Sequence, residues 1–219
     1  KSPLDILKAN EQAQIPLLLG WNSAEIPGQG VMQGQSMEPS NYLNRIKALY
    51  PKDYEEVLKH YPGNSAQEVL ASATALASDR FISYSTWKWG SLHGLMSKKP
   101  VFRYLFNKIP PAVIGSSPNA PRPFGAPHAC EIEYCMGNLK LVKQMNWTED
   151  DHLVSKTMFS YFANFIKTGN PNGADLPQWE PLKPANDLGE IMMLDVVSKS
   201  VLLSSENRYR LLDRLYGNN

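Results

Sequence analysis

The feature that most constrains the fold is a nearly continuous apolar run, Ile15–Trp21, with Gly20 and Asn22 marking its exit. Such a run, without regular polar alternation, is typical of a strand buried on both faces of a parallel sheet. Glu25 follows in the loop beyond this strand. Because open α/β folds collect their chemistry at the carboxyl ends of their strands, Glu25 is a candidate site residue.

A second strand is predicted at Val101–Phe106, where β-forming residues follow Pro100. It leads into a proline-dense loop and then to His128. A histidine on a stiff loop after a strand is placed where a scaffold can hold a catalytic base. Taken alone it is a weak signal, because most histidines are ordinary surface or core residues. The prolines of this loop are Pro110, Pro111, Pro118, Pro121, Pro123 and Pro127.

The remaining elements alternate with these strands. A helical pattern covers residues 40–97, with a break at Pro62-Gly63-Asn64. Thr148 and the acids after it predict the start of a long helix that ends at Gly169. A hairpin is expected at Ile191–Leu194 and Val201–Leu203, followed by an amphipathic helix over residues 204–216. The segment around Gly28, Gly30 and Gly34 is expected to be flexible.

Composition narrows the function classes. A chain of 219 residues is large enough for one substantial core, which is compatible with a single domain. Lys and Arg (22) balance Asp and Glu (21), which does not suggest a nucleic-acid partner. No apolar run is long enough for a transmembrane segment. Cys130 and Cys135 are expected to be buried free thiols rather than reactive ones. No metal or cofactor is expected from the motifs.

Five stretches stand out in order along the chain: PLLLGWNSAE at residues 16–25, SDRFI at 78–82, KPVFRYLFNKIPP at 99–111, GAPHACEIEY at 125–134 and FANFIKTGNPNG at 162–173. Together they resemble the second half of the type-B carboxylesterase and cholinesterase family of α/β-hydrolases. In that family a G-x-N-x-x-E loop supplies the acid of a catalytic triad, and a later G-x-x-H-x-x-E segment supplies the base.

The resemblance implies an α/β-hydrolase portion, a mostly parallel sheet flanked by helices, with Glu25 as triad acid and His128 as base. The nucleophilic serine normally sits in a G-x-S-x-G elbow, and this sequence contains none. We therefore expect a C-terminal portion of a serine carboxylesterase that acts on carboxylic esters. Its partner would be the N-terminal half of the same hydrolase, and the chain alone would be inactive.

The sequence departs from the family at both motifs. Ala24-Glu25-Ile26 stands where the family usually has Asp-Glu-Gly, and His128-Ala129-Cys130-Glu131 stands where it often has His-Gly-x-Glu. Ala129 narrows the dihedral choices of a loop position that often holds glycine. Glu131 matches the family's acid after the base, where it is either a hydrogen-bonding support or a surface carboxylate.

Three further residues are weaker candidates for contact with substrate. Trp87 and Trp89 are candidates for lining a substrate gorge, although packing roles are also open. His93 lies near Trp89 in sequence and is a candidate contact as well.

Two interpretations compete with the esterase. One is a catalytically inactive adhesion or recognition relative, although the retention of both Glu25 and His128 argues against it. The other is a free-standing scaffold, whose sheet would expose an unpaired edge and an apolar face. An isolated chain would then be expected to dimerise, bind a partner fragment or rearrange its packing. The resemblance favours a secreted or periplasmic location.

Overall fold

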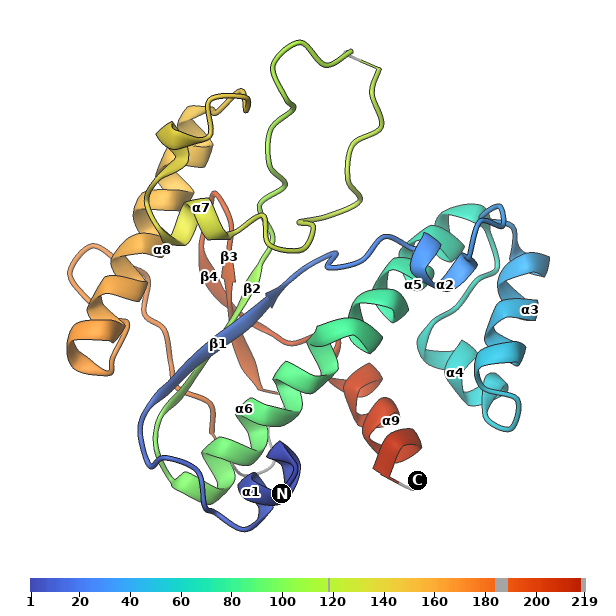
Figure 1. Ribbon diagram of the computed structural model, residues 1–219, viewed down its shortest axis with the longest axis horizontal. Coiled ribbons are helices and arrows are strands. Elements are labelled where there is room, and N and C mark those ends of the chain that lie inside the picture. The colour runs from blue at the N-terminus through green and yellow to red at the C-terminus, as the bar shows by residue number, and fades with distance from the viewer. Residues whose placement is uncertain (118, 184–188, 218–219) are drawn as a thin grey trace.

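A four-stranded sheet forms the centre of the computed structural model, which describes residues 1–117, 119–183 and 189–217 (Figure 1). Pro118 of the proline-rich loop therefore lies outside the described residues. The spatial order is β1 (Leu17–Asn22), β2 (Val101–Phe106), β3 (Glu190–Leu194) and β4 (Lys199–Leu202). The first three strands are parallel, and β4 returns antiparallel to β3. Both predicted strands and the predicted hairpin are confirmed.

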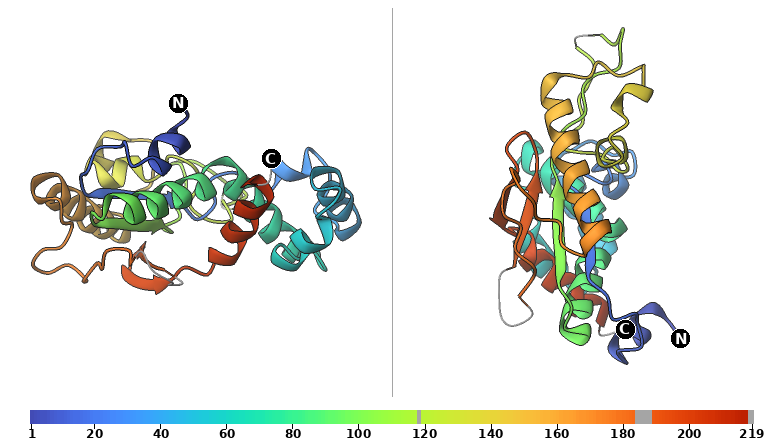
Figure 2. Two further views of the ribbon diagram at one scale, coloured as in Figure 1. Left: turned by 90° about the horizontal axis from the view of Figure 1, so that it is seen from below. Right: turned by 90° about the vertical axis from the view of Figure 1, so that its left-hand side faces the viewer.

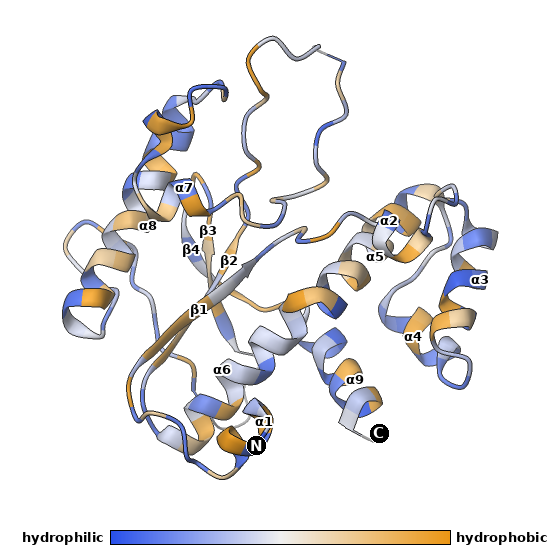
Figure 3. Ribbon diagram, viewed as in Figure 1, coloured by the Kyte–Doolittle hydropathy of each residue, from blue (hydrophilic) through white to orange (hydrophobic). Residues whose placement is uncertain are grey.

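The register brings the carboxyl ends of β1 and β2 level, because Leu17 pairs with Val101 and Asn22 with Phe106. Hydrophobic residues extend over much of both strands (Figure 3). β1 pairs on one side only, so its other edge has no strand partner among the described residues. Gly20 is required within β1, since a Cβ there would lie 2.4 Å from the backbone oxygen of Tyr104.

One face of the sheet is covered by α8 (Glu149–Thr168), which begins with the predicted cap. The Thr148 side chain and the Asp151 carboxylate form a reciprocal capping box, and Gly169 ends the helix with a positive φ. Val154, Met158 and Tyr161 of α8 pack in one buried cluster with the aromatic side chains of β2 and the apolar side chains of β3.

The opposite face is covered by α6 (Tyr84–Ser97) and α9 (Glu206–Gly217), as Figure 2 shows. Trp87 of α6 and Tyr209 of α9 pack with Trp21 of β1 in a second buried cluster. The indole N–H of Trp87 donates to Glu206 over 3.0 Å, which joins the two helices.

A helical lobe lies beyond the acid-bearing loop. It contains α2 (Gln29–Met32), α3 (Pro39–Leu49), α4 (Tyr54–His60) and α5 (Ala66–Ser78). The prediction of a flexible segment around Gly28, Gly30 and Gly34 is wrong for α2. Val31 and Met32 are buried in the core of the lobe, and burial of these side chains orders a segment whose local composition favours a loop.

Short elements complete the chain: α1 (Pro3–Lys8), α7 (Ile132–Cys135), the 3₁₀-helix η2 (Leu139–Leu141) and the π-helix η1 (Asp79–Ser83). η1 joins α5 to α6 and is anchored by Asp79. The buried Asp79 carboxylate accepts from Tyr61 Oη and from Arg208 Nε, each over 2.9 Å. No helix in the described parts of the chain is long and apolar enough to cross a membrane.

Candidate active site

The loop after β1 and the loop before α7 are joined by backbone hydrogen bonds at the carboxyl edge of the sheet. Ala24 N donates to Ala126 O over 3.0 Å, and His128 N donates to Glu25 O over 3.3 Å. The Ser23 hydroxyl accepts from Ala126 N over 3.0 Å. The long segment from β2 to residue 127 projects away from the sheet and then returns to this edge (Figure 1).

Gly125 makes this close approach feasible. A Cβ at Gly125 would lie 2.8 Å from Ser23 Oγ and 3.0 Å from Ala24 Cβ. A larger residue there would force the Ser23 hydroxyl away from Ala126 N and crowd the Ala24 side chain on the facing loop. The glycine is therefore needed for the spacing between the acid-bearing and histidine-bearing loops.

Glu25 and His128 form a direct pair. His128 Nδ1 lies 2.7 Å from Glu25 Oε2, and the other carboxylate oxygen accepts from Asn22 N over 2.7 Å. Burial raises the pKa of Glu25, while hydrogen bonds from Asn22 N–H and His128 oppose that rise. An ionised carboxylate only accepts, so Nδ1 carries the proton and Nε2 is left with a free lone pair.

The buried Asn22 side chain links the same two loops. Its Nδ2 donates to Pro127 O over 2.8 Å and to Glu131 Oε2 over 2.5 Å. Glu131 is thus tied to the end of β1, and its charge adds to the rise in the Glu25 pKa. A supporting role of Glu131 in catalysis stays a prediction. In the sequence, Asn22 was recognised only as an exit marker, and its place in the G-x-N-x-x-E pattern was the available signal.

Two neighbours of His128 have distinctive environments. Ala129 has φ 63°, in the left-handed region that favours glycine. Cys130 and Cys135 are free, as expected, but half-buried rather than buried. Burial raises the pKa of the Cys130 thiol, and it raises the pKa of the Cys135 thiol to about 11. Such thiols have little thiolate character.

Phe81, on η1, lies against the histidine. Its ring centroid is 5.0 Å from that of His128 and the ring planes meet at 88°. In the sequence Phe81 belongs to the predicted helical pattern and to the family-like stretch SDRFI, and neither indicates a contact with His128. No local signal reveals a π-helical turn or a contact between such distant segments.

The three weaker candidates lie elsewhere. Trp87 is buried against Tyr209, and Trp89 lies in an apolar groove between α1 and α6. The buried His93 contacts Ile15 O through Nε2 over 2.8 Å, which ties α6 to the chain before β1. None of the three shares a described contact with Glu25 or His128, so a role in substrate binding stays a prediction.

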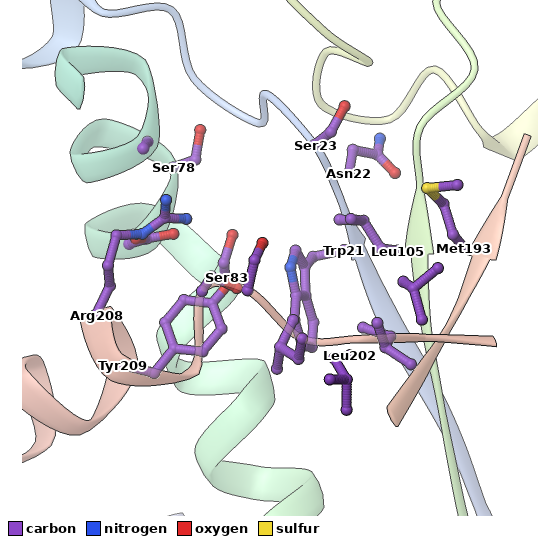
Figure 4. Close-up of a pocket in the computed structure, with 17 residues that line it drawn as sticks. Trp21, Asn22, Ser23, Ser78, Ser83, Leu105, Met193, Leu202, Arg208 and Tyr209 are labelled. Carbon is purple, nitrogen blue, oxygen red and sulfur yellow. The ribbon is translucent and has the colours of Figure 1, made fainter. Parts of the chain in front are cut away.

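A cavity of ≈ 250 Å³ lies beside this site, between the sheet and α9. Asn22 and Ser23 form the part of its wall nearest the acid-bearing loop. Figure 4 shows Ser78, Ser83, Arg208 and Tyr209 on one side and Trp21, Leu105 and Met193 on the other. His128 does not line it.

The arrangement is a buried carboxylate that orients a half-exposed imidazole. Such a pair can accept a proton from a hydroxyl nucleophile and return it to a leaving group. Within the described residues, no group of three or more His, Cys, Asp or Glu side chains is placed to hold a metal. The sheet of three parallel strands and one antiparallel strand, flanked by helices, is that of a partial α/β-hydrolase fold.

The comparisons agree with this class. Residues 1–200 match the carboxylesterase family. Carboxylesterase 4A of Bos taurus is 26% identical over 99% of this chain and 40% of its own length. Carboxylesterase 5A of Homo sapiens is 27% identical over 86% of this chain and 34% of its own length. Acetylcholinesterase of Electrophorus electricus is 32% identical over 52% of this chain and 17% of its own length.

The chain belongs to the carboxylesterase family. It spans about two fifths of the length of the bovine relative and less of the other two.

Proposed function

We propose that this chain supplies the acid and the base of a serine carboxylesterase. The observation that carries the proposal is the 2.7 Å contact between His128 Nδ1 and Glu25 Oε2 at the carboxyl edge of parallel strands. Glu25 orients the imidazole and stabilises its protonated form. Nε2 of His128 takes the proton from the attacking hydroxyl and later donates it to the leaving alcohol.

The nucleophile would come from a part of the hydrolase outside these residues. The sequence has no G-x-S-x-G, and the unpaired edge of β1 offers backbone groups to a further strand. A strand that paired there in parallel would end beside Glu25 and His128. Residues 1–219 would then be the C-terminal portion of one domain, and the N-terminal half would be its partner.

A carboxylic ester is the proposed substrate. The support is the names of the relatives: two are carboxylesterases, and another, from Mus musculus, is an acylcarnitine hydrolase at 25% identity. Hydrolysis would proceed through an acyl-enzyme. The serine oxygen adds to the ester carbonyl, the alcohol leaves with the proton from His128, and water then releases the acid.

The test is hydrolysis of p-nitrophenyl butyrate by the whole hydrolase and by the isolated 219-residue chain. We expect turnover by the whole protein that fluorophosphonate abolishes, and none by the isolated chain. Serine-dependent turnover by the pure isolated chain would contradict the division of roles. A whole protein without activity on any ester, with the serine elbow altered, would favour the adhesion-type relative instead.

A further inference from the structure

We propose that Phe81 is a positioning residue for the imidazole of His128. Its ring would keep Nδ1 directed at Glu25 and shield the pair from water. The inference builds on the proposed function, because it assumes that the orientation of His128 matters for catalysis. The physical claim about the imidazole can be tested without an ester.

The backbone conformation around Phe81 directs this ring toward His128. η1 is a π-helical turn, and π-turns inserted between α-helices redirect side chains and are frequent at functional sites. Asp79 and Ser83 at its two ends are buried, whereas Phe81 between them is 50% exposed. The turn therefore directs a large apolar side chain away from the core of the lobe and against His128.

The turn is also held at a fixed place relative to the catalytic pair. Asp79 bonds to Tyr61 and Arg208 in the interior. Directly before the turn, the Ser78 hydroxyl accepts from Ile26 N over 3.2 Å, next to Glu25. This hydrogen bond joins the acid-bearing loop to η1. The Phe81 ring and the Glu25 carboxylate therefore contact His128 from two segments that are held in place relative to each other.

The imidazole needs such a restraint. Its side chain is 50% exposed, and of its ring nitrogens only Nδ1 has a described partner, Glu25. One hydrogen bond leaves the ring free to rotate out of line. A ring edge-to-face at 5.0 Å limits that rotation and excludes water from one side of the hydrogen bond. Among the described ring contacts, Phe81 and His128 pair only with each other.

Two variants separate this role from simple packing. Phe81→Leu keeps an apolar side chain and removes the ring, whereas Phe81→Tyr keeps the ring. Phe159→Leu is the matched control, because Phe159 is 48% exposed on α8 and makes no described contact with His128. Since both phenylalanines are half-exposed, we expect all three variants to fold, and their melting temperatures check this.

The readouts are the tautomer of His128, from ¹⁵N NMR of the whole hydrolase, and the rate at which diethyl pyrocarbonate modifies this imidazole. His128→Ala identifies the signals of this histidine. In Phe81→Leu we expect the population of the Nε2–H tautomer and the modification rate to rise by about two- to tenfold, the range that an aromatic pair contact supports. Phe81→Tyr and Phe159→Leu should match the wild type.

Two outcomes would overturn the proposal. One is a Phe81→Leu chain that keeps the wild-type tautomer ratio and modification rate. The other is a Phe159→Leu chain that changes as much as Phe81→Leu, which would indicate a general loss of order. Neither readout depends on ester hydrolysis, so failure here is distinguishable from failure of the proposed function.

Discussion

Nδ1 of His128 lies 2.7 Å from Oε2 of Glu25, although 103 positions separate the two residues in the sequence. This contact forms because β1 and β2 end at the same level of the sheet. Backbone hydrogen bonds then join the loop that carries Glu25 to the loop that carries His128. The orientation of the imidazole is therefore a property of the sheet edge. Changes that separate the loops should disturb the pair without touching either side chain.

Replacing Gly125 with alanine should separate the loops. The new Cβ would lie 2.8 Å from Ser23 Oγ, too close for an unstrained contact. We expect a loss of about 1–3 kcal/mol in the free energy of unfolding, as for other overpacked sites. Urea unfolding measures it. Gly217→Ala, where a Cβ meets nothing within 4 Å, should stay within about 0.5 kcal/mol of the wild type. Equal effects of the two substitutions would contradict the role of Gly125.

Replacing Ala129 with glycine should stabilise the chain. A left-handed conformation destabilises a residue with a side chain by about 1–2 kcal/mol, and glycine removes that strain. Glycine also makes the unfolded chain more flexible, which offsets roughly 0.5–1 kcal/mol of the gain. The net gain in the free energy of unfolding should be about 0.5–1 kcal/mol. Ala120→Gly, at an exposed loop position without a positive φ, should not stabilise. A destabilised Ala129→Gly chain would show that the left-handed conformation carries no strain.

Glu25 should make stability depend on pH. Burial raises the pKa of Glu25 above 4.5 in the folded chain. The folded chain therefore binds this proton more tightly than the unfolded chain does, which stabilises the fold below that pH. The stabilisation is lost as the pH rises through the folded pKa. The free energy of unfolding of the wild type minus that of Glu25→Gln should therefore decrease from pH 4 upward and then level off. Urea unfolding at each pH measures this.

A His128→Ala background removes the titration of the imidazole from that comparison. In this background the difference should again decrease as the pH rises. The hydrogen bond and the charge of His128 both lower the Glu25 pKa, so their removal leaves the rise caused by burial in place. A difference that grows in favour of the wild type as the pH rises would contradict the burial argument.

Asp79→Asn should destabilise the chain more than Glu25→Gln or Asp213→Asn does. It would leave Arg208 without its partner at 2.9 Å. Loss of one member of a buried pair costs roughly 3–5 kcal/mol, and the 29% exposure of the Arg208 side chain favours the lower end. Thermal and urea unfolding measure the change.

The control is Asp213→Asn, which breaks a partly exposed pair with Lys88 and should cost about 1 kcal/mol or less. If the two substitutions cost the same, the buried network would not anchor η1 as the geometry indicates.

Much of the architecture could be predicted because it depends on local or periodic signals. The apolar run at residues 15–21 predicted β1, and Thr148 with the acids that follow it predicted the start of α8. Placing Glu25 and His128 after strands was also possible from the sequence. Their contact was expected only from the family resemblance, because spacing along the chain does not reveal which loops meet.

The unpredicted features depend on tertiary packing. α2 forms in a glycine-rich segment because Val31 and Met32 are buried against the lobe. Asn22 links two loops through contacts with residues more than a hundred positions away. The π-turn that carries Phe81 has the composition of an ordinary helix. Burial and long-range contacts decide these features, and no local pattern carries that information.

The central claim is that Glu25 and His128 act as one unit, and a double-variant cycle on the whole hydrolase tests it most directly. The measurement is kcat/KM for p-nitrophenyl butyrate in Glu25→Gln, His128→Ala and the double variant. We expect a loss of roughly 10⁴-fold or more in each single variant, and no further loss in the double variant beyond that of His128→Ala. Losses that multiply in the double variant, or a His128→Ala enzyme as active as the wild type, would contradict the account.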